Sequence, residues 1–146
     1  MELEKDLNCK NNLGLIGWLW AGNYGIERYL YILHRLTGLG ILLYFFLHIF
    51  VSSLRIFGPG PWEGAMGTVE NPIFKFGEYL VFVAFIFHGL NGIRLVFQEL
   101  GLGLGKPTPP IFPFTDSIHK YRYYVWIVIV LFFIAAAIAF FDMFIK

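Results

Sequence analysis

Two uninterrupted apolar runs constrain this chain more than any other feature of its sequence. Residues 36–54 and residues 123–141 are each a stretch of 19 residues without a charged side chain. An α-helix of that length extends roughly 28 Å, which matches the hydrocarbon thickness of a bilayer. Because backbone groups in lipid need internal hydrogen bonds, such segments cross a membrane as helices. The sequence therefore predicts an all-α membrane protein.

A third apolar stretch lies between these two runs. The uncharged segment 79–93 has only 15 residues and is bounded by Glu78 and Arg94. It is long enough to span the bilayer when it is extended at both ends, with the two charged side chains snorkelling toward the membrane faces. The three predicted transmembrane helices are 28–56, 75–99 and 121–143.

Composition supports this class of protein and excludes several others. The chain has 146 residues, of which 58% are hydrophobic and only 14% charged, too few charges to cover a soluble domain. A net charge of +1 without a dense basic patch argues against a nucleic-acid partner. The single cysteine, Cys9, excludes an internal disulfide and an iron–sulfur cluster held by this chain alone. Residues 1–12 are polar, so we expect no cleavable signal peptide.

Lysine and arginine are distributed unevenly between the two sides of the predicted membrane domain. One side has eight of them and the other has three, which places the N-terminus inside and the C-terminus outside. We expect residues 1–27 to form a cytoplasmic and interfacial segment, in which 13–24 lie along the inner membrane surface. Residues 28–146 form the membrane domain. Its glycine- and proline-rich connectors, 58–72 and 101–114, are predicted to be loops.

Small residues mark helix faces that could approach other helices closely. They are Gly38 and Gly40 in the first span and Ala84, Gly89 and Gly92 in the second. Such faces specify helix contacts in lipid, where no hydrophobic force drives association. Since three helices make a poor independent bundle, we expect helices of another chain to complete it.

Two of the four histidines lie deep inside predicted spans. His34 and His119 are near water, whereas His48 and His88 are buried at lipid depth. A neutral imidazole there needs a hydrogen-bond partner or a metal. Haem suits an apolar helix bundle with single histidines, because its iron takes an imidazole on each side of a flat apolar ring.

His88 has the surroundings that a haem ligand requires. Ala84 and Gly92 are four residues away on either side, so small side chains flank the imidazole and leave room for a porphyrin. Arg94 is about 9 Å farther along the helix, within reach of a haem propionate. These residues predict that His88 is an axial ligand of haem iron.

His48 is at a different depth from His88. Measured from the inner side, His48 is roughly 20 Å deep and His88 roughly 9 Å deep, so one haem shared by both is not expected. Either His48 ligates the iron of a second, outer haem, or it is a core histidine bonded to a neighbouring helix.

Two motifs in these spans resemble a known family. YILHRLTG (31–38) and HGLNGIRLVFQELG (88–101) are similar to S-x-x-H-R-x-[ST]-G and H-x-x-x-G-I-R-H-x-x-x-D-x-G. These segments are typical of the large cytochrome b membrane-anchor subunit of succinate dehydrogenase, or succinate:quinone oxidoreductase. The order of the motifs, the helices that carry them and the chain length agree with that family.

The resemblance implies a role in a larger complex. In that family, haem b lies between this subunit and a second, small membrane anchor, which supplies the other axial ligand. A flavoprotein subunit with FAD and an iron–sulfur subunit dock on the inner face, and electrons pass to a quinone. By position, His88 is the haem ligand, His34 and Arg35 lie near the propionates, and Tyr31 and Arg35 lie near the quinone. The chain itself performs no succinate chemistry.

The sequence departs from the family pattern at four positions. Tyr31 replaces the family serine near the quinone, Leu95 replaces a histidine, Glu99 replaces an aspartate, and His48 is an addition. One haem, or two if His48 is a ligand, is therefore expected.

Three alternatives remain open at this point. The chain could be the cytochrome b anchor of a fumarate reductase, or that of another quinone-linked enzyme such as a hydrogenase or formate dehydrogenase. It could also be a structural anchor or assembly protein without haem. We expect a prokaryotic plasma membrane, with the mitochondrial inner membrane as the alternative.

Overall fold

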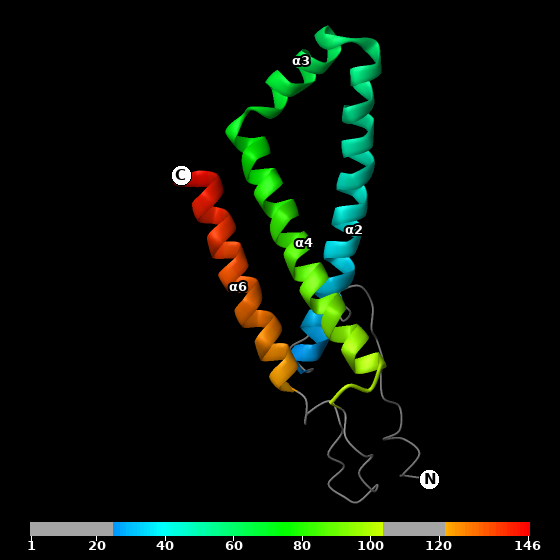
Figure 1. The fold of residues 1–146 in the computed structure, drawn as a ribbon, viewed down its shortest axis with the longest axis vertical. Coiled ribbons are helices and arrows are strands. Elements are labelled where there is room, and N and C mark those ends of the chain that lie inside the picture. Colours follow the sequence, from blue (N-terminus) through cyan, green and yellow to red (C-terminus); the bar gives the residue numbers. More distant parts are fainter. Residues whose placement is uncertain (1–24, 104–121) are drawn as a thin grey trace, which may run out of the picture. The chain divides into compact units, whose positions relative to one another are not determined.

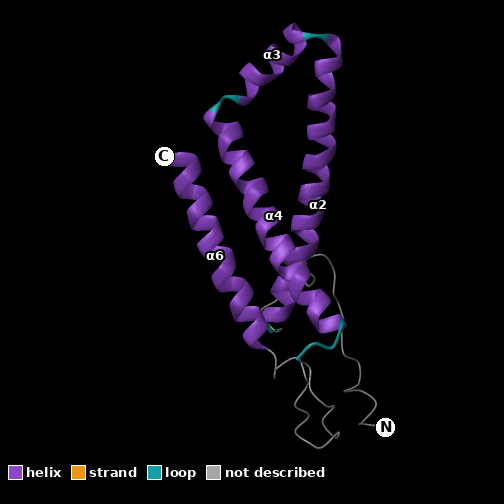
Figure 2. Ribbon diagram, in the orientation of Figure 1, coloured by secondary structure: helices purple, strands orange, loops and turns teal. Residues whose placement is uncertain are grey.

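The computed structural model describes residues 25–103 and 122–146. Their elements in order are α2 (Ile26–Ser53), the short 3-10 helix η1 (Leu54–Phe57), α3 (Pro59–Val69), α4 (Pro72–Glu99) and α6 (Arg122–Phe144), shown in Figures 1 and 2. All regular structure in these two segments is helical. The chain divides into two compact units, Met1–Ile32 and Leu33–Lys146. The predicted interfacial segment 13–24, most of the second connector and His119 lie outside the described residues.

Three helices are long and apolar enough to cross a membrane, as the sequence predicts. The first is α2 together with η1, the second is α4 and the third is α6. The bounds differ from the predicted ones by only a few residues. Helix α4 begins at Pro72, because the side chain of Asn71 caps it by accepting a hydrogen bond from Ile73 N at 2.9 Å. A proline at the first helical position needs no hydrogen-bond donor, so it is tolerated there.

The prediction that the connector 58–72 is a loop is wrong. Most of it forms the helix α3, whose two prolines lie in the first turn, where a missing N–H breaks no helical hydrogen bond. Gly58, with a φ of 101°, makes the turn from η1 into α3. The Arg55 guanidinium carbon lies 4.0 Å from the centre of the Trp62 ring and so joins η1 to α3.

Within the unit Leu33–Lys146, α6 packs lengthwise against α4 (Figure 1). Phe87 of α4 meets Phe132 of α6 edge to face, with ring centroids 5.6 Å apart. The Tyr79 hydroxyl donates a hydrogen bond to the carbonyl oxygen of Ala136 at 3.2 Å. The buried residues of α6 recur every three to eight positions along one face: Val125, Val128, Ala136 and Ala139.

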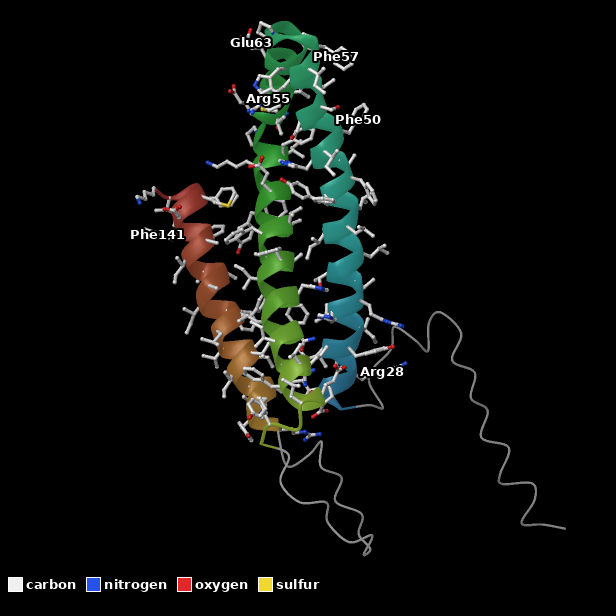
Figure 3. The ribbon with its side chains drawn as sticks, turned by 45° about the vertical axis from the view of Figure 1, so that its right-hand side comes forward. Arg28, Phe50, Arg55, Phe57, Glu63 and Phe141 are labelled. Carbon is white, nitrogen blue, oxygen red and sulfur yellow. The ribbon has the colours of Figure 1, made fainter. Side chains whose placement is uncertain are left out.

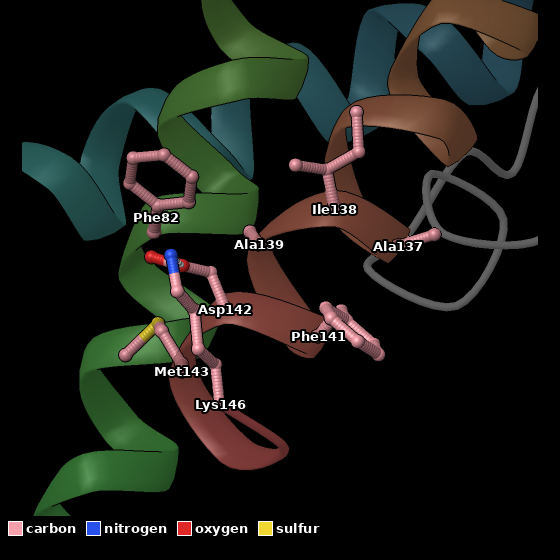
Figure 4. Close-up of a pocket in the computed structure, with 8 residues that line it drawn as sticks. All are labelled: Phe82, Ala137, Ile138, Ala139, Phe141, Asp142, Met143 and Lys146. Carbon is pink, nitrogen blue, oxygen red and sulfur yellow. Dashed lines mark ion pairs between the residues drawn. The ribbon is translucent and has the colours of Figure 1, made fainter.

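The outer faces of these helices are apolar and uncovered by the chain itself. None of the most apolar window of α2 is buried. Phe50 and Phe57 project away from the ribbon in Figure 3 and are 68% and 73% exposed. Beside the last turns of α6, an open apolar groove holds Phe82 and Ala139, with the Asp142–Lys146 ion pair (3.4 Å) at its edge (Figure 4). Side chains of this kind are suited to lipid and to helices of other chains.

Candidate functional site

Helices α2 and α4 approach each other at His88. A Cβ atom added to Gly38 of α2 would lie 2.8 Å from Cε1 and 3.3 Å from Nδ1 of His88. The first distance is shorter than real Cβ contacts, so any side chain larger than a hydrogen atom at position 38 would make the imidazole shift. The glycine therefore provides the space in which the imidazole rests against the backbone of α2.

One nitrogen of the His88 ring is held by α2. Nδ1 lies 3.0 Å from the carbonyl oxygen of His34 and 3.4 Å from Oγ1 of Thr37. A carbonyl oxygen only accepts, so Nδ1 carries the hydrogen and donates it. The Thr37 hydroxyl in turn donates to the carbonyl of Leu33 at 2.7 Å.

The other nitrogen of His88 is thereby left as a base. When Nδ1 of a neutral imidazole is protonated, Nε2 carries the lone pair. Within the described part of the chain, Nε2 makes no hydrogen bond and is not among the buried atoms that lack one. It is therefore the atom of this site that a metal ion could reach.

His34 packs directly on His88. The two rings are parallel to within 5°, with centroids 4.0 Å apart. Nδ1 of His34 is buried and has no hydrogen-bond partner among the residues that the structure describes. A Cβ on Gly92 would lie 3.6 Å from Cε1 of His34. Part of the small-residue face that the sequence suggested for a porphyrin therefore contacts α2 of the same chain.

Arg94 is buried, and the expectation that it snorkels toward a membrane face is wrong. Its side chain is only 6% exposed, and its Nε donates to Oδ1 of Asn91 at 2.9 Å. Asn91 itself is 0% exposed. Its Nδ2 is buried without a partner in the described segments. Sequence reasoning missed Asn91, although an amide three residues before an arginine in an apolar helix is a signal for such a pair.

The remaining predicted site residues are exposed. Arg35 is exposed on α2. Tyr31 is 43% exposed, with the Arg28 guanidinium carbon 5.8 Å from its ring centre. His48 is exposed and lies over Tyr44, with ring centroids 5.8 Å apart. It follows Gly38 by ten residues, about 15 Å along α2, so the structure does not bring it to His88.

The donor set at this site fits a haem. Among the described residues no cluster of three or more histidine, cysteine, aspartate or glutamate side chains could hold a metal ion. A haem needs only one or two side-chain ligands, because the porphyrin supplies the other four. His88, with Nδ1 engaged and Nε2 available, meets that requirement.

Comparison with known proteins agrees with this architecture. The succinate dehydrogenase/fumarate reductase transmembrane subunit family matches residues 19–141. The chain is 30% identical over 78 residues to the succinate dehydrogenase 2 membrane subunit SdhC of Mycobacterium tuberculosis, covering 53% of this chain and 56% of that protein. It is 35% identical over 75 residues to the succinate dehydrogenase hydrophobic membrane anchor subunit of Halobacterium salinarum, covering 51% and 58%.

These matches span just over half the length of either relative. The family match is broader, because it includes all three apolar helices. Together they establish an all-α, integral, multi-pass membrane protein. The chain belongs to the succinate dehydrogenase/fumarate reductase transmembrane subunit family.

Proposed function

We propose that this chain is the haem b-binding anchor subunit, of the large cytochrome b type, in a succinate:quinone oxidoreductase. The observation that carries the proposal is the state of His88: Nδ1 donates to the His34 carbonyl and Nε2 is left open. Metal-ligating histidines generally hold their second nitrogen in this way, which orients the ring and makes the other nitrogen more basic.

In this proposal His88 Nε2 and a histidine of the second, small membrane anchor would hold the haem iron. The bound haem b would supply single-electron transfer at this position. His34, Arg35 and Arg94 are the proposed propionate contacts. Nε of Arg94 donates to Oδ1 of Asn91, which restrains that guanidinium.

The proposed partners follow from the family and from the names of the two relatives, both described as membrane subunits of succinate dehydrogenase. A flavoprotein with FAD and an iron–sulfur subunit would dock on the inner face and oxidise succinate. Electrons would reach a quinone near Tyr31 and Arg35. This chain would anchor the soluble subunits and contribute to the quinone site, and its exposed apolar faces would meet lipid and the second anchor.

A fumarate reductase anchor is the second candidate, because the family includes both enzymes. The two differ in the direction of electron flow, and the same site serves either.

Purification of the intact complex from its native membrane tests the proposal. We expect copurifying flavin, succinate:quinone reductase activity and a b-type band in the reduced-minus-oxidised spectrum. Absence of that band would contradict haem binding and leave a haem-free anchor. Haem without flavin would favour a hydrogenase-type anchor.

The quinone contact has a separate test. Arg35→Leu should lower succinate:quinone reduction more than succinate oxidation with an artificial dye acceptor, because the dye takes electrons from the soluble subunits. Arg55→Leu, at the opposite end of the same span, is the matched control. Equal losses in both assays for Arg35→Leu would refute the quinone role.

A further inference from the structure

We infer that Gly38 and Thr37, together with the main-chain carbonyl of His34, form a seat that sets the ring orientation and the protonated nitrogen of His88. These are positioning residues, since they act on the reacting centre through His88. The inference rests on the proposed function, in which His88 ligates haem iron. It assigns a role to the first span that the motif alone does not indicate.

The first part of the seat is steric. A methyl group at position 38 would overlap the His88 ring, with Cβ 2.8 Å from Cε1. The imidazole cannot move away from position 38 without weakening two contacts. One is the stacking on the parallel His34 ring, with centroids 4.0 Å apart, and the other is the hydrogen bond from Nδ1 to the His34 carbonyl oxygen at 3.0 Å. Gly38 is therefore required for the observed ring position.

The second part of the seat is the pair of acceptors that face Nδ1. The His34 carbonyl lies at 3.0 Å and Thr37 Oγ1 at 3.4 Å. Because Thr37 gives its own hydrogen to the Leu33 carbonyl, its oxygen faces His88 as an acceptor. Two acceptors around Nδ1 hold the proton there and raise the electron density on Nε2, which favours the oxidised form of a bound iron.

Among the neighbouring glycines, Gly40 provides a matched control for the steric part. A Cβ on Gly40, two residues farther along α2, would meet nothing within 4 Å. A Cβ on Gly92 of α4 would meet His34 Cε1 at 3.6 Å, which is ordinary van der Waals contact. Only Gly38 among these three is too close to its neighbour for an alanine.

The decisive experiment compares Gly38→Ala with Gly40→Ala in the full complex. Alanine is favoured over glycine inside a helix by about 1 kcal/mol, so helix formation is preserved in both variants. The readouts are assembled flavin-containing complex, haem per flavin after washing, and the low-spin ferric signal in electron paramagnetic resonance. We expect Gly38→Ala alone to retain haem about tenfold less well and to show a shifted signal.

If the unsubstituted complex contains haem and Gly38→Ala matches Gly40→Ala in haem content and spectrum, the inference is wrong and the proposed function stands. If the unsubstituted complex contains no b-type haem, the proposed function falls and the inference falls with it.

Thr37 is tested by a pair of conservative changes. Thr37→Val keeps the shape of the side chain and removes the acceptor, whereas Thr37→Ser keeps the hydroxyl. We expect the Thr37→Val complex to keep its haem and the midpoint potential of that haem to rise. In the Thr37→Ser complex the midpoint potential should equal that of the unsubstituted complex. Identical potentials for Val and Ser would exclude Thr37 from the seat.

Discussion

His34 contacts His88 twice, once with its ring and once with its backbone. The two imidazoles are stacked with centroids 4.0 Å apart, and the His34 carbonyl oxygen lies 3.0 Å from Nδ1 of His88. A side-chain substitution at position 34 removes the first contact and leaves the second. The effect of the His34 ring on the orientation of the His88 ring can thus be measured separately from the effect of the His34 carbonyl, which decides which His88 nitrogen is protonated.

Replacement of His34 should affect the order of the His88 ring more than its ligation. His34→Ala leaves one face of the ring unsupported, while His34→Phe keeps a flat ring there. We expect both variants to contain haem, with a broadened low-spin ferric signal in the alanine variant only. The same linewidth in both variants would show that stacking does not restrain the ring.

Asn91 is expected to stabilise the chain through Arg94. Asn91→Leu removes the acceptor of the buried Arg94 Nε, which costs about 1–3 kcal/mol. Thermal unfolding of the detergent-solubilised complex should therefore shift to a lower temperature. The double variant Asn91→Leu/Arg94→Met removes both partners and should recover much of the loss. If the two single effects simply add in the double variant, the pair does not interact.

The transmembrane helices were predictable because a long charge-free segment in lipid satisfies its backbone hydrogen bonds by forming a helix. Helix α3 was not predictable, since glycine and proline oppose helices on average. The helix is explained by the position of its prolines in the first turn and by the Arg55–Trp62 contact. The need of His88 for a hydrogen-bond partner was also predictable, because a neutral imidazole at that depth must bond a polar group or a metal, and its Nδ1 bonds the His34 carbonyl oxygen. Its contact with Gly38 and His34 was not, because it depends on the relative rotation of two helices, which sequence spacing leaves undetermined.

Tyr79 should contribute to the packing of α6 on α4. Tyr79→Phe keeps the ring and removes the hydrogen bond to the Ala136 carbonyl, a loss of about 0.6 kcal/mol for a typical interhelical bond in a membrane. Tyr44→Phe, whose hydroxyl makes no hydrogen bond in the described part of the chain, is the control. We expect a lower unfolding temperature for Tyr79→Phe alone. Equal temperatures for the two variants would count against this bond.

His48 is not expected to hold the haem proposed at His88, because it lies about 15 Å along α2 from Gly38 and is exposed beside Tyr44. His48→Ala should leave the haem per flavin unchanged. A fall to half would establish a second haem with His48 as its ligand.

In the proposed function, Nε2 of His88 coordinates iron in a haem shared with a second anchor. A density map of the purified complex, prepared with its native partner subunits, tests this directly. We predict a porphyrin whose iron is coordinated by His88 Nε2 on one side and by a histidine of the second anchor on the other, with Nδ1 still on the His34 carbonyl. A map in which the His88 ring meets only protein or lipid would exclude His88 as a haem ligand.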